Sequence, residues 1–175
     1  MNLEEEITEA IGHCKNTDVA SAYYTRLAEG DLLRDENMYS HFCAYFLPYN
    51  PQNKTLLIGD HKKSGKWLVP GGHIDARETL LLTLNREIKE ELGVTDFFSK
   101  RPQPFLITIT DIEHDVRACK KHFDLWHLMV TDGKNFMIDD TEYHETRWVT
   151  IEEARELTND HANIQALNAL KKMNI

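Results

Sequence analysis

Four stretches of the chain place apolar residues every three or four positions, which is the spacing of a helix with one buried face. These stretches are Leu3 to Cys14, Val19 to Leu27, Ile151 to Leu157 and Ala162 to Lys172. Gly30 follows the second stretch, at a place where glycine commonly ends a helix. The pattern therefore predicts two helices near the start of the chain and two near its end.

Five other stretches are rich in aromatic and β-branched residues or alternate polar with apolar side chains, as strands do. They are Tyr39 to Leu47, Thr55 to Ile58, Phe105 to Ile112, Phe123 to Thr131 and Arg147 to Thr150. Pro48 to Asn53 is predicted to be a turn, and the HKKSGK segment that starts at His61 is predicted to be a loop. Strands interleaved with helices indicate an α/β domain built in layers.

The segment Gly72 to Val94 has the most regular helical pattern in the chain. Its apolar residues form one stripe of a helix, and they are Leu80, Leu81, Leu84, Ile88 and Leu92. Thr79 precedes this stripe as a candidate N-cap, while Asp75 and Glu78 offer an alternative capping box. Gly93 fits the residue that ends a helix in a left-handed conformation. We therefore predict one helix between Thr79 and Gly93.

The same helix carries three carboxylates at neighbouring positions. Glu87, Glu90 and Glu91 are spaced i, i+3 and i+4, so a helix places them on one face, where like charges repel. A divalent cation would turn that repulsion into binding. Mg²⁺ prefers oxygen ligands and is commonly shared between one or two carboxylates and substrate phosphates. The pattern thus indicates metal-assisted chemistry on a phosphorylated substrate, with a solvated acidic helix face as the plainer alternative.

The segment resembles the Nudix box, G-x5-E-x7-R-E-U-x-E-E-x-G-U, in which U is a bulky aliphatic residue. The residues that fill its nine positions are Gly72, Glu78, Arg86, Glu87, Ile88, Glu90, Glu91, Gly93 and Val94. A match at nine fixed positions is far more specific than a lone glycine motif. The resemblance is sharp from Trp67 to Val94, looser from Tyr39 to Leu157, and does not cover the N-terminal region.

The resemblance implies both a fold and an activity. The implied fold is α/β, a Nudix-type α/β/α sandwich with a mixed sheet, formed by residues 38–175 as a Nudix hydrolase domain. Residues 1–37 would then be an N-terminal helical extension. The implied activity is metal-dependent hydrolysis of a pyrophosphate bond in a nucleoside diphosphate linked to another group.

The resemblance also implies roles for residues at matching positions. The implied metal ligands are the backbone carbonyl of Gly71 and the side chains of Glu87, Glu90 and Glu91. Mg²⁺ is the expected ion, with Mn²⁺ as an alternative. Arg86 would orient Glu87 or Glu90, and Glu78 would brace the loop. The general base is left open among Glu87, Glu113, Glu142 and Glu145.

Five residues outside the box are candidates for contacts with substrate, namely Trp67, His122, Asp124, Glu142 and Glu145. The flat indole of Trp67 suits a nucleobase, and packing beneath the box loop is its alternative role. His122 and Asp124 alternate on one strand, so both can point toward the cleft, but the favoured interpretation is a satisfied polar pair on a partly exposed strand. Residues interpreted as structural or core are His73, Trp126, Trp148 and Cys43.

The composition limits the kinds of partner that the protein is expected to bind. The net charge of −9 argues against a long nucleic acid. No apolar run approaches the roughly 20 residues that span a bilayer, and the acidic start of the chain is unlike a signal peptide. The three cysteines, Cys14, Cys43 and Cys119, show no C-x2-C spacing and are expected to be reduced thiols. We expect a small phosphorylated substrate, a nucleotide above all, no membrane partner, a cytoplasmic location, and a homodimer as an open alternative to a monomer.

Two other functional classes remain open from the sequence. The fold can serve as a nucleotide-binding or sensor module, because fold alone does not fix function. The same fold also hosts isopentenyl diphosphate isomerase, which needs a catalytic cysteine and usually departs from the strict box. The complete set of glutamates in this chain favours the hydrolase over both.

Overall fold

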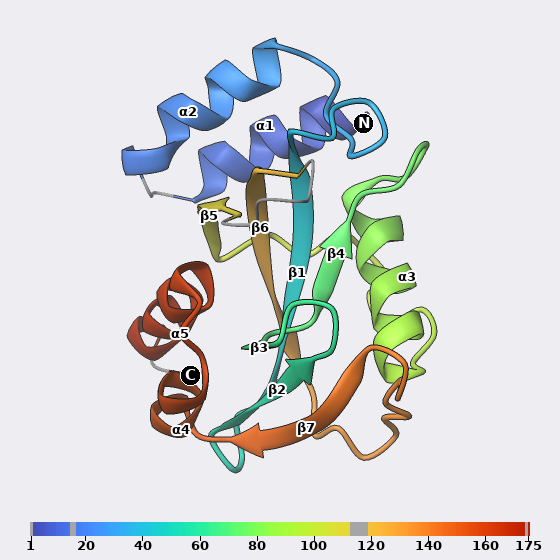
Figure 1. Cartoon of the computed structure of the whole chain (residues 1–175), viewed down its shortest axis with the longest axis vertical. Coiled ribbons are helices and arrows are strands. Elements are labelled where there is room, and N and C mark those ends of the chain that lie inside the picture. The colour runs from blue at the N-terminus through green and yellow to red at the C-terminus, as the bar shows by residue number, and fades with distance from the viewer. Residues whose placement is uncertain (1, 15–16, 113–118, 174) are drawn as a thin grey trace.

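A computed structural model of the chain describes residues 2–14, 17–112, 119–173 and 175 (Figure 1). Its helices are α1 (Leu3–His13), α2 (Thr17–Ala28), α3 (Leu80–Leu92), α4 (Ile151–Leu157) and α5 (His161–Lys172). Its strands are β1 (Ser40–Asn50), β2 (Thr55–His61), β3 (Lys66–Leu68), β4 (Gly71–His73), β5 (Leu106–Asp111), β6 (Lys121–Val130) and β7 (Tyr143–Val149). None of the helices among the described residues is long and apolar enough to cross a bilayer.

The strands form one mixed sheet in the order β3-β2-β1-β6-β5, to which β4 is added beside β1 and β7 beside β2. The long central pair, β1 and β6, runs parallel from Ser40 opposite Lys121 to Tyr49 opposite Val130. All other pairs are antiparallel. Because parallel neighbours need a long crossover, the chain between β1 and β6 has room for the helix that the box predicts.

Helices cover both faces of this sheet, which confirms the predicted sandwich. On one face, Phe42, Ala44 and Phe46 of β1 pack in one core cluster with the leucines of α3 and with α1 and α2. On the other face, Leu47 and Tyr49 belong to a second cluster with α4 and α5. Figure 1 shows α3 beside β4 and the pair α4 and α5 on the opposite side of the sheet.

The two N-terminal helices pack against the sandwich through buried side chains. Ile7 and Ala10 of α1 are fully buried in the cluster that holds α3. From α2, the Tyr23 hydroxyl donates to the backbone carbonyls of Thr108 (2.8 Å) and Asp124 (2.7 Å). These contacts fasten α2 to β5 and β6, since buried polar groups need such partners.

The predicted turn at Pro48 was wrong, because β1 continues to Asn50 and the turn begins at residue 51. A proline is tolerated here because Pro48 lies between the part of β1 that pairs with β4 and the part that pairs with β2. The Asn50 side chain then accepts from the Gln52 amide (3.0 Å), which shapes the turn.

Strand β2 continues three residues past its predicted end, strand β7 begins four residues before its predicted start, and two short strands were missed. Strands β2 and β7 pair along six positions, from Leu56 opposite Val149 to His61 opposite Tyr143. The added residues, at the C-terminal end of β2 and the N-terminal end of β7, are mostly polar. They were not predicted because they lack the alternation of apolar and polar residues that identifies a strand. Strands β3 and β4 have three residues each, and β4 is Gly-Gly-His, which carries no strand propensity.

Candidate active site

Helix α3 is positioned by its caps and by its buried stripe. The Thr79 hydroxyl accepts from the Leu82 amide, and Gly93 ends the helix with φ 70°. Both ends therefore agree with the prediction. Leu80, Leu84, Ile88 and Leu92 are fully buried and fix which side of the helix faces the sheet. The carboxylates at the C-terminal half of α3 thus point in directions that the core sets.

The two glycines that precede the box helix allow the backbone to approach both β1 and α3. Gly71 has φ 141°, and a Cβ there would lie 2.6 Å from the Ala44 carbonyl oxygen. A Cβ at Gly72 would lie 2.3 Å from Oε1 of Glu87. Only a residue without a side chain at each position allows the loop to lie this close to β1 and to the Glu87 carboxylate.

Arg86 holds three parts of the site together. Its Nε donates to Glu78 Oε1 (2.8 Å), and its Nη2 donates to Glu78 Oε2 (3.0 Å) and to the His73 carbonyl (2.8 Å). Its Nη1 donates to Glu87 (2.7 Å) and Glu90 (3.1 Å). A planar guanidinium can make all these contacts at once, whereas an ammonium cannot.

Glu78 braces the loop at its N-terminal side. Besides Arg86, its carboxylate accepts from the Thr83 hydroxyl (2.8 Å) and the Asp75 amide (3.2 Å). Burial opposes ionisation, but the hydrogen bonds from Arg86 and Thr83 hold the pKa of Glu78 below its ordinary value. Glu78 is therefore a charged anchor with its oxygens committed to the protein.

The three glutamates of the box helix lie at different depths. Glu90 is the exposed one, with 56% of its side chain accessible, while that of Glu87 is 12% accessible. Glu91 is buried beside the apolar stripe, where it accepts from the Gly71 amide (3.0 Å) and from the Tyr143 hydroxyl. The stripe is thus flanked by Glu87 and Glu91 instead of lying wholly on the opposite face.

Burial shifts the acidity of the two deeper carboxyls. It raises the pKa of Glu87 to about 6, against the opposing effect of Arg86. It raises the pKa of Glu91 to about 8, despite the hydrogen bond from Tyr143. Without a cation, Glu91 is therefore largely protonated near neutral pH. A bound cation reverses this, because its charge stabilises the carboxylates around it.

The residues present fit a hard divalent cation. Every side-chain donor of the group is a carboxylate oxygen, which suits Mg²⁺ or Mn²⁺. Gly72 lets the Glu87 carboxylate lie against the loop, in the position that a Cβ would otherwise occupy. Glu91 is a buried acid whose ionised form a nearby positive charge would favour near neutral pH. These three observations agree on the same place, between the Gly71–Gly72 loop and α3.

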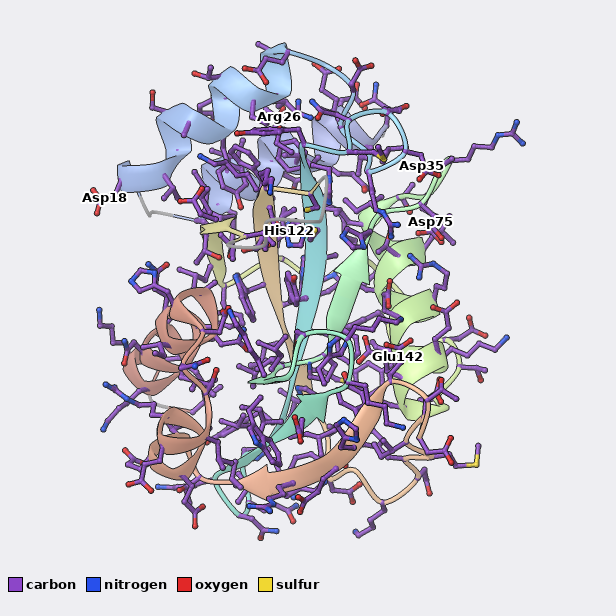
Figure 2. All side chains as sticks on the ribbon, viewed as in Figure 1. Asp18, Arg26, Asp35, Asp75, His122 and Glu142 are labelled. Atoms are coloured by element: carbon purple, nitrogen blue, oxygen red, sulfur yellow. The ribbon has the colours of Figure 1, made fainter. Side chains whose placement is uncertain are left out.

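The general-base candidates that follow α3 in the sequence differ in their position relative to the candidate metal site. Glu142 lies near the C-terminal half of α3 in Figure 2 and is paired with Lys63 (2.6 Å) and His61 (3.4 Å). Its charge contributes to the raised pKa of Glu91, so it belongs to the surroundings of the site. Glu145 is exposed and paired with Arg147 (2.6 Å). Glu113 lies outside the described residues.

Trp67 lies on β3, away from the box helix. Its ring packs against the α4 and α5 core cluster, and the Arg147 guanidinium carbon lies 5.0 Å from the ring centroid. Trp126 is buried as expected, and its Nε1 donates to the Thr108 hydroxyl (2.8 Å). Trp148 is only partly buried and stacks on Phe136.

The interpretation of His122 and Asp124 as a satisfied, partly exposed pair was wrong. Asp124 is buried, and only its Oδ2 is hydrogen-bonded, by the hydroxyls of Thr108 and Thr110. Its Oδ1 has no partner among the described residues. Burial raises the pKa of Asp124 to about 7.

His122 instead belongs to a group of side chains that the sequence interpretation did not connect. Its neighbours are His41, Cys43 and His73, which come from two other strands. The signals were the H-x-C spacing at residues 41–43 and the C-x2-H spacing from Cys119 to His122. A test for C-x2-C alone does not detect either pattern.

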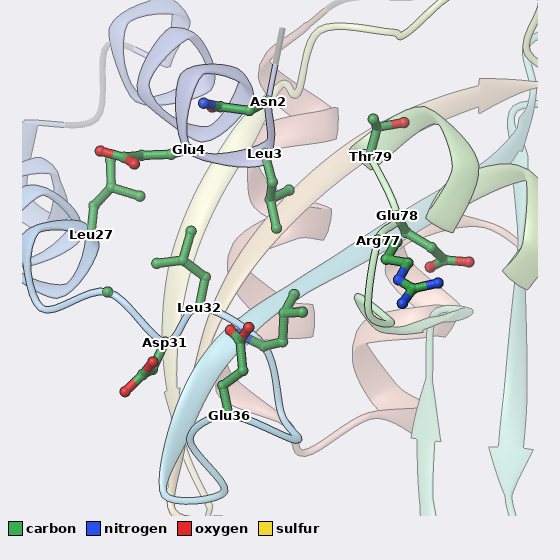
Figure 3. A pocket seen from close by; sticks show the side chains of 12 residues that line it. Asn2, Leu3, Glu4, Leu27, Asp31, Leu32, Glu36, Arg77, Glu78 and Thr79 are labelled. Atoms are coloured by element: carbon green, nitrogen blue, oxygen red, sulfur yellow. The ribbon is translucent and has the colours of Figure 1, made fainter.

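The N-terminal helices also reach the start of the box loop. A pocket lies between α1, the 30–36 segment and residues 77–79, and Figure 3 shows its lining side chains. Leu3, Leu27 and Leu32 form part of its wall, and Arg77 and Glu78 form its edge on the loop. Glu87, Glu90 and Glu91 do not line this pocket, so it is separate from the candidate metal site that these glutamates form.

Known proteins resemble the chain in sequence and fold. A family model for the NUDIX domain matches residues 39–169. The CMP-5'-(N-acetyl-N-hydroxy-3-aminopropyl)phosphonate hydrolase of Streptomyces rubellomurinus is 30% identical in an alignment of 142 residues that covers 75% of this chain. The chain spans only 64% of the length of that relative.

Two solved structures illustrate the likeness in fold. The dihydroneopterin triphosphate pyrophosphohydrolase of E. coli superposes with a TM-score of 0.55 at 18% identity, covering 72% of this chain and 91% of that one. The NUDIX domain of Shewanella oneidensis NrtR, complexed with ADP ribose, superposes with a TM-score of 0.60 at 12% identity, covering 77% and 88%. At such identities the likeness shows the fold alone.

Proposed function

Because this chain belongs to the NUDIX-domain family, we propose that it is a metal-dependent pyrophosphohydrolase that acts on a nucleotide or nucleotide derivative. The observation that carries the proposal is the network around Arg86. One guanidinium fixes Glu78, Glu87 and Glu90 beside a loop whose Gly72 lets the Glu87 carboxylate lie directly against the backbone. Such fixed polar groups are what electrostatic catalysis needs, because they do not have to reorganise during the reaction.

We propose that Gly71, Glu87, Glu90 and Glu91 hold Mg²⁺, with Mn²⁺ as an alternative. When bound, the ion would neutralise phosphate charge and lower the pKa of a bound water. The protein's own part is to keep the ligands in place. Arg86 holds Glu87 and Glu90, while Tyr143 and the Gly71 amide hold Glu91.

Glu87 is our first candidate for the general base. Arg86 holds its carboxylate in place through a hydrogen bond of 2.7 Å, so one oxygen is oriented by the protein while the group accepts a proton from water. Glu142 remains a second candidate from the later loop, because its charge acts on Glu91. Glu145 is engaged by Arg147 and is the weaker candidate among the described residues.

The substrate class is a nucleoside diphosphate linked to another group. The named relatives act on a CMP derivative or a pterin triphosphate, and the NrtR domain is complexed with ADP ribose. Contacts from Trp67 and Glu142 to the substrate stay predictions. So do a cytoplasmic location, a homodimer and a division of the chain at residue 37.

A panel of nucleotides tests the proposal. Nucleoside triphosphates, dinucleotides and nucleotide sugars are incubated with Mg²⁺ or Mn²⁺, and released monophosphates are identified by chromatography. Glu90→Gln or Glu91→Gln should lower turnover by at least about a hundredfold, as losing a transition-state contact does. Glu156→Gln, on the exposed face of α4, is the matched control and should keep full activity.

The same panel, extended with isopentenyl diphosphate, separates the alternatives. A sensor module would bind one of the nucleotides without releasing product. An isomerase would convert isopentenyl diphosphate without releasing phosphate. If the folded protein turns over no member of the panel, the hydrolase proposal fails.

A further inference from the structure

Four side chains from three strands converge at a place separate from the three glutamates of α3. His41 and Cys43 lie on β1, His73 ends β4, and His122 lies on β6. One possible ligand atom from each lies within 4.8 Å of those of the other three. The register explains the meeting, since His41 is opposite His122 and Cys43 is opposite His73. Residues two apart on a strand share a face, so all four point to one side of the sheet.

The three imidazoles form a closed triangle. The ring centroids of His41 and His73 are 4.8 Å apart, those of His41 and His122 are 5.0 Å apart, and those of His73 and His122 are 5.2 Å apart. His41 and Cys43 are completely buried, and His73 and His122 are partly buried. Three imidazole rings and a thiol are thus gathered at one largely buried place.

Burial favours the neutral form of all three rings. Burial lowers the pKa of His73 to about 4 and of His122 to about 3, and it also lowers the pKa of His41. Neighbouring positive charge from Arg34 acts in the same direction on each ring. A neutral imidazole has a free ring lone pair, which is the form that binds metals.

His41 already has the outer hydrogen bond of a metal ligand. Its Nδ1 lies 3.0 Å from the Asn37 carbonyl oxygen. A carbonyl can only accept, so Nδ1 carries the proton and Nε2 keeps its lone pair. Histidines that bind metals usually donate their other N–H to such a carbonyl, which fixes ring and tautomer.

A second thiol lies at the edge of the group. The Cys119 sulfur lies 2.9 Å from His122 Nε2 and 3.6 Å from His41 Nε2. Cys119 is partly exposed, in contrast to the buried Cys43. The site therefore offers three nitrogens and a buried sulfur, with another sulfur at its opening.

We propose that His41, Cys43, His73 and His122 bind a transition metal of the Zn²⁺ class at a site separate from the carboxylates of α3. Tetrahedral Zn²⁺ separates its nitrogen and sulfur ligands by about 3.3 to 3.8 Å, so the side chains would close inward by about 1 Å. Imidazole and thiolate favour Zn²⁺, whereas Mg²⁺ favours oxygen, so the two sites select different ions.

Such a metal would also fasten the box loop. The His73 carbonyl accepts from Arg86 (2.8 Å), and His73 directly follows Gly71 and Gly72. Ligation of the His73 ring would tie this loop to β1 and β6 from the side opposite Arg86. The proposal gives His122 a metal partner in place of the substrate contact considered above. It does not depend on the proposed hydrolysis.

Cobalt(II) is the direct probe, because its visible spectrum reports tetrahedral geometry and bound thiolate. The full-length protein is stripped with a chelator, titrated with Co²⁺ and then challenged with Zn²⁺. We expect one equivalent of Co²⁺ with a thiolate charge-transfer band that Zn²⁺ removes. Cys43→Ser should abolish that band, and His122→Gln should weaken Zn²⁺ binding by at least about tenfold.

Two control variants mark the site. Cys14→Ser alters a buried cysteine whose thiol lies against the Pro104 carbonyl, and it should keep the spectrum. Glu90→Gln should also keep it, whether or not the protein hydrolyses nucleotides. Far-ultraviolet circular dichroism confirms the fold of each variant, and His73→Gln replaces any variant that does not fold.

Three results would overturn the proposal. One is a folded wild-type protein that gives no tetrahedral cobalt spectrum. Another is Zn²⁺ affinity in His122→Gln and His73→Gln equal to that of the wild type. The third is a charge-transfer band that survives Cys43→Ser and disappears in Cys119→Ser. That result would identify Cys119, and not Cys43, as the thiolate ligand.

Discussion

The carboxylate of Glu6 accepts a hydrogen bond from the Leu80 amide over 2.8 Å, which joins α1 to the first turn of the box helix. The first turn of α3 has no acidic residue of its own. Glu6, which is buried, supplies from another helix the negative charge that favours a helix N-terminus. The N-terminal helices thereby stabilise the element that carries the candidate active site.

Glu6→Ala should lower the free energy of unfolding by about 1 to 3 kcal/mol, because it leaves a buried amide without an acceptor. Glu6→Gln keeps an acceptor and should cost less. Urea denaturation measures both. The control is Glu4→Ala, on the exposed side of the same helix. Equal losses in Glu4→Ala and Glu6→Ala would show that the contact with Leu80 does not matter.

Arg86→Lys should lower kcat by about tenfold to a hundredfold with little change in the fold. An ammonium keeps the charge but cannot reach Glu78, Glu87, Glu90 and the His73 carbonyl together. Steady-state kinetics with Mg²⁺ and a turned-over nucleotide measure the effect. Arg77→Lys, an exposed change in the same loop, should leave kcat unaltered. Similar kcat values for the two variants would show that Arg86 does not position the glutamates for catalysis.

Gly72→Ala should inactivate the protein by about a hundredfold or more, because the new Cβ would lie 2.3 Å from Oε1 of Glu87 and push that carboxylate away. Gly12→Ala is the matched control. A Cβ at Gly12 meets nothing within 4 Å, so this change should keep activity. Turnover of Gly72→Ala at the level of Gly12→Ala would contradict the proposed position of Glu87.

The metal-free protein should lose stability as the pH rises through the range from about 5 to about 8. The folded-state pKa values of Glu87 (about 6) and Glu91 (about 8) lie above the ordinary glutamate value of 4.5. The folded protein therefore binds more protons, and this contribution is complete below the unfolded pKa and lost on passing the folded one. Glu91→Gln should flatten the dependence.

Thermal unfolding at several pH values, in the presence of a chelator, measures this effect. The comparison is between the wild type, Glu91→Gln and the exposed control Glu156→Gln. A wild-type profile that matches Glu91→Gln would show that Glu91 is not a buried acid. Added Mg²⁺ should restore wild-type stability most at the alkaline end, where the carboxylates are free to bind it.

The box could be predicted in detail because its information is local. Thr79, the leucine stripe and Gly93 define one helix, and the spacing of Glu87, Glu90 and Glu91 along it then fixes their mutual positions. The depth of Glu91 could not be predicted, since it depends on Tyr143, which is 52 residues away in sequence. Nothing local to a helix says which distant strand covers it.

The histidine group was missed for the same physical reason. His41, His73 and His122 come from strands whose neighbours are set by a parallel pairing and by a three-residue strand. The pairing of β4 with β1 depends on Gly71 and Gly72, which look like a turn in sequence. Each histidine taken alone is an ordinary polar residue on a strand, and only the register brings the rings together.

Calorimetric titration of Mg²⁺ into the folded, metal-stripped protein, with and without AMP, tests the central claim most directly. Mg²⁺ is chosen because it binds poorly to imidazole and thiolate, so the histidine group does not contribute. The account predicts uptake by the wild type and by Glu156→Gln, and affinity reduced by at least about tenfold in Glu90→Gln. No uptake in either condition, or equal uptake by Glu90→Gln and Glu156→Gln, would contradict it.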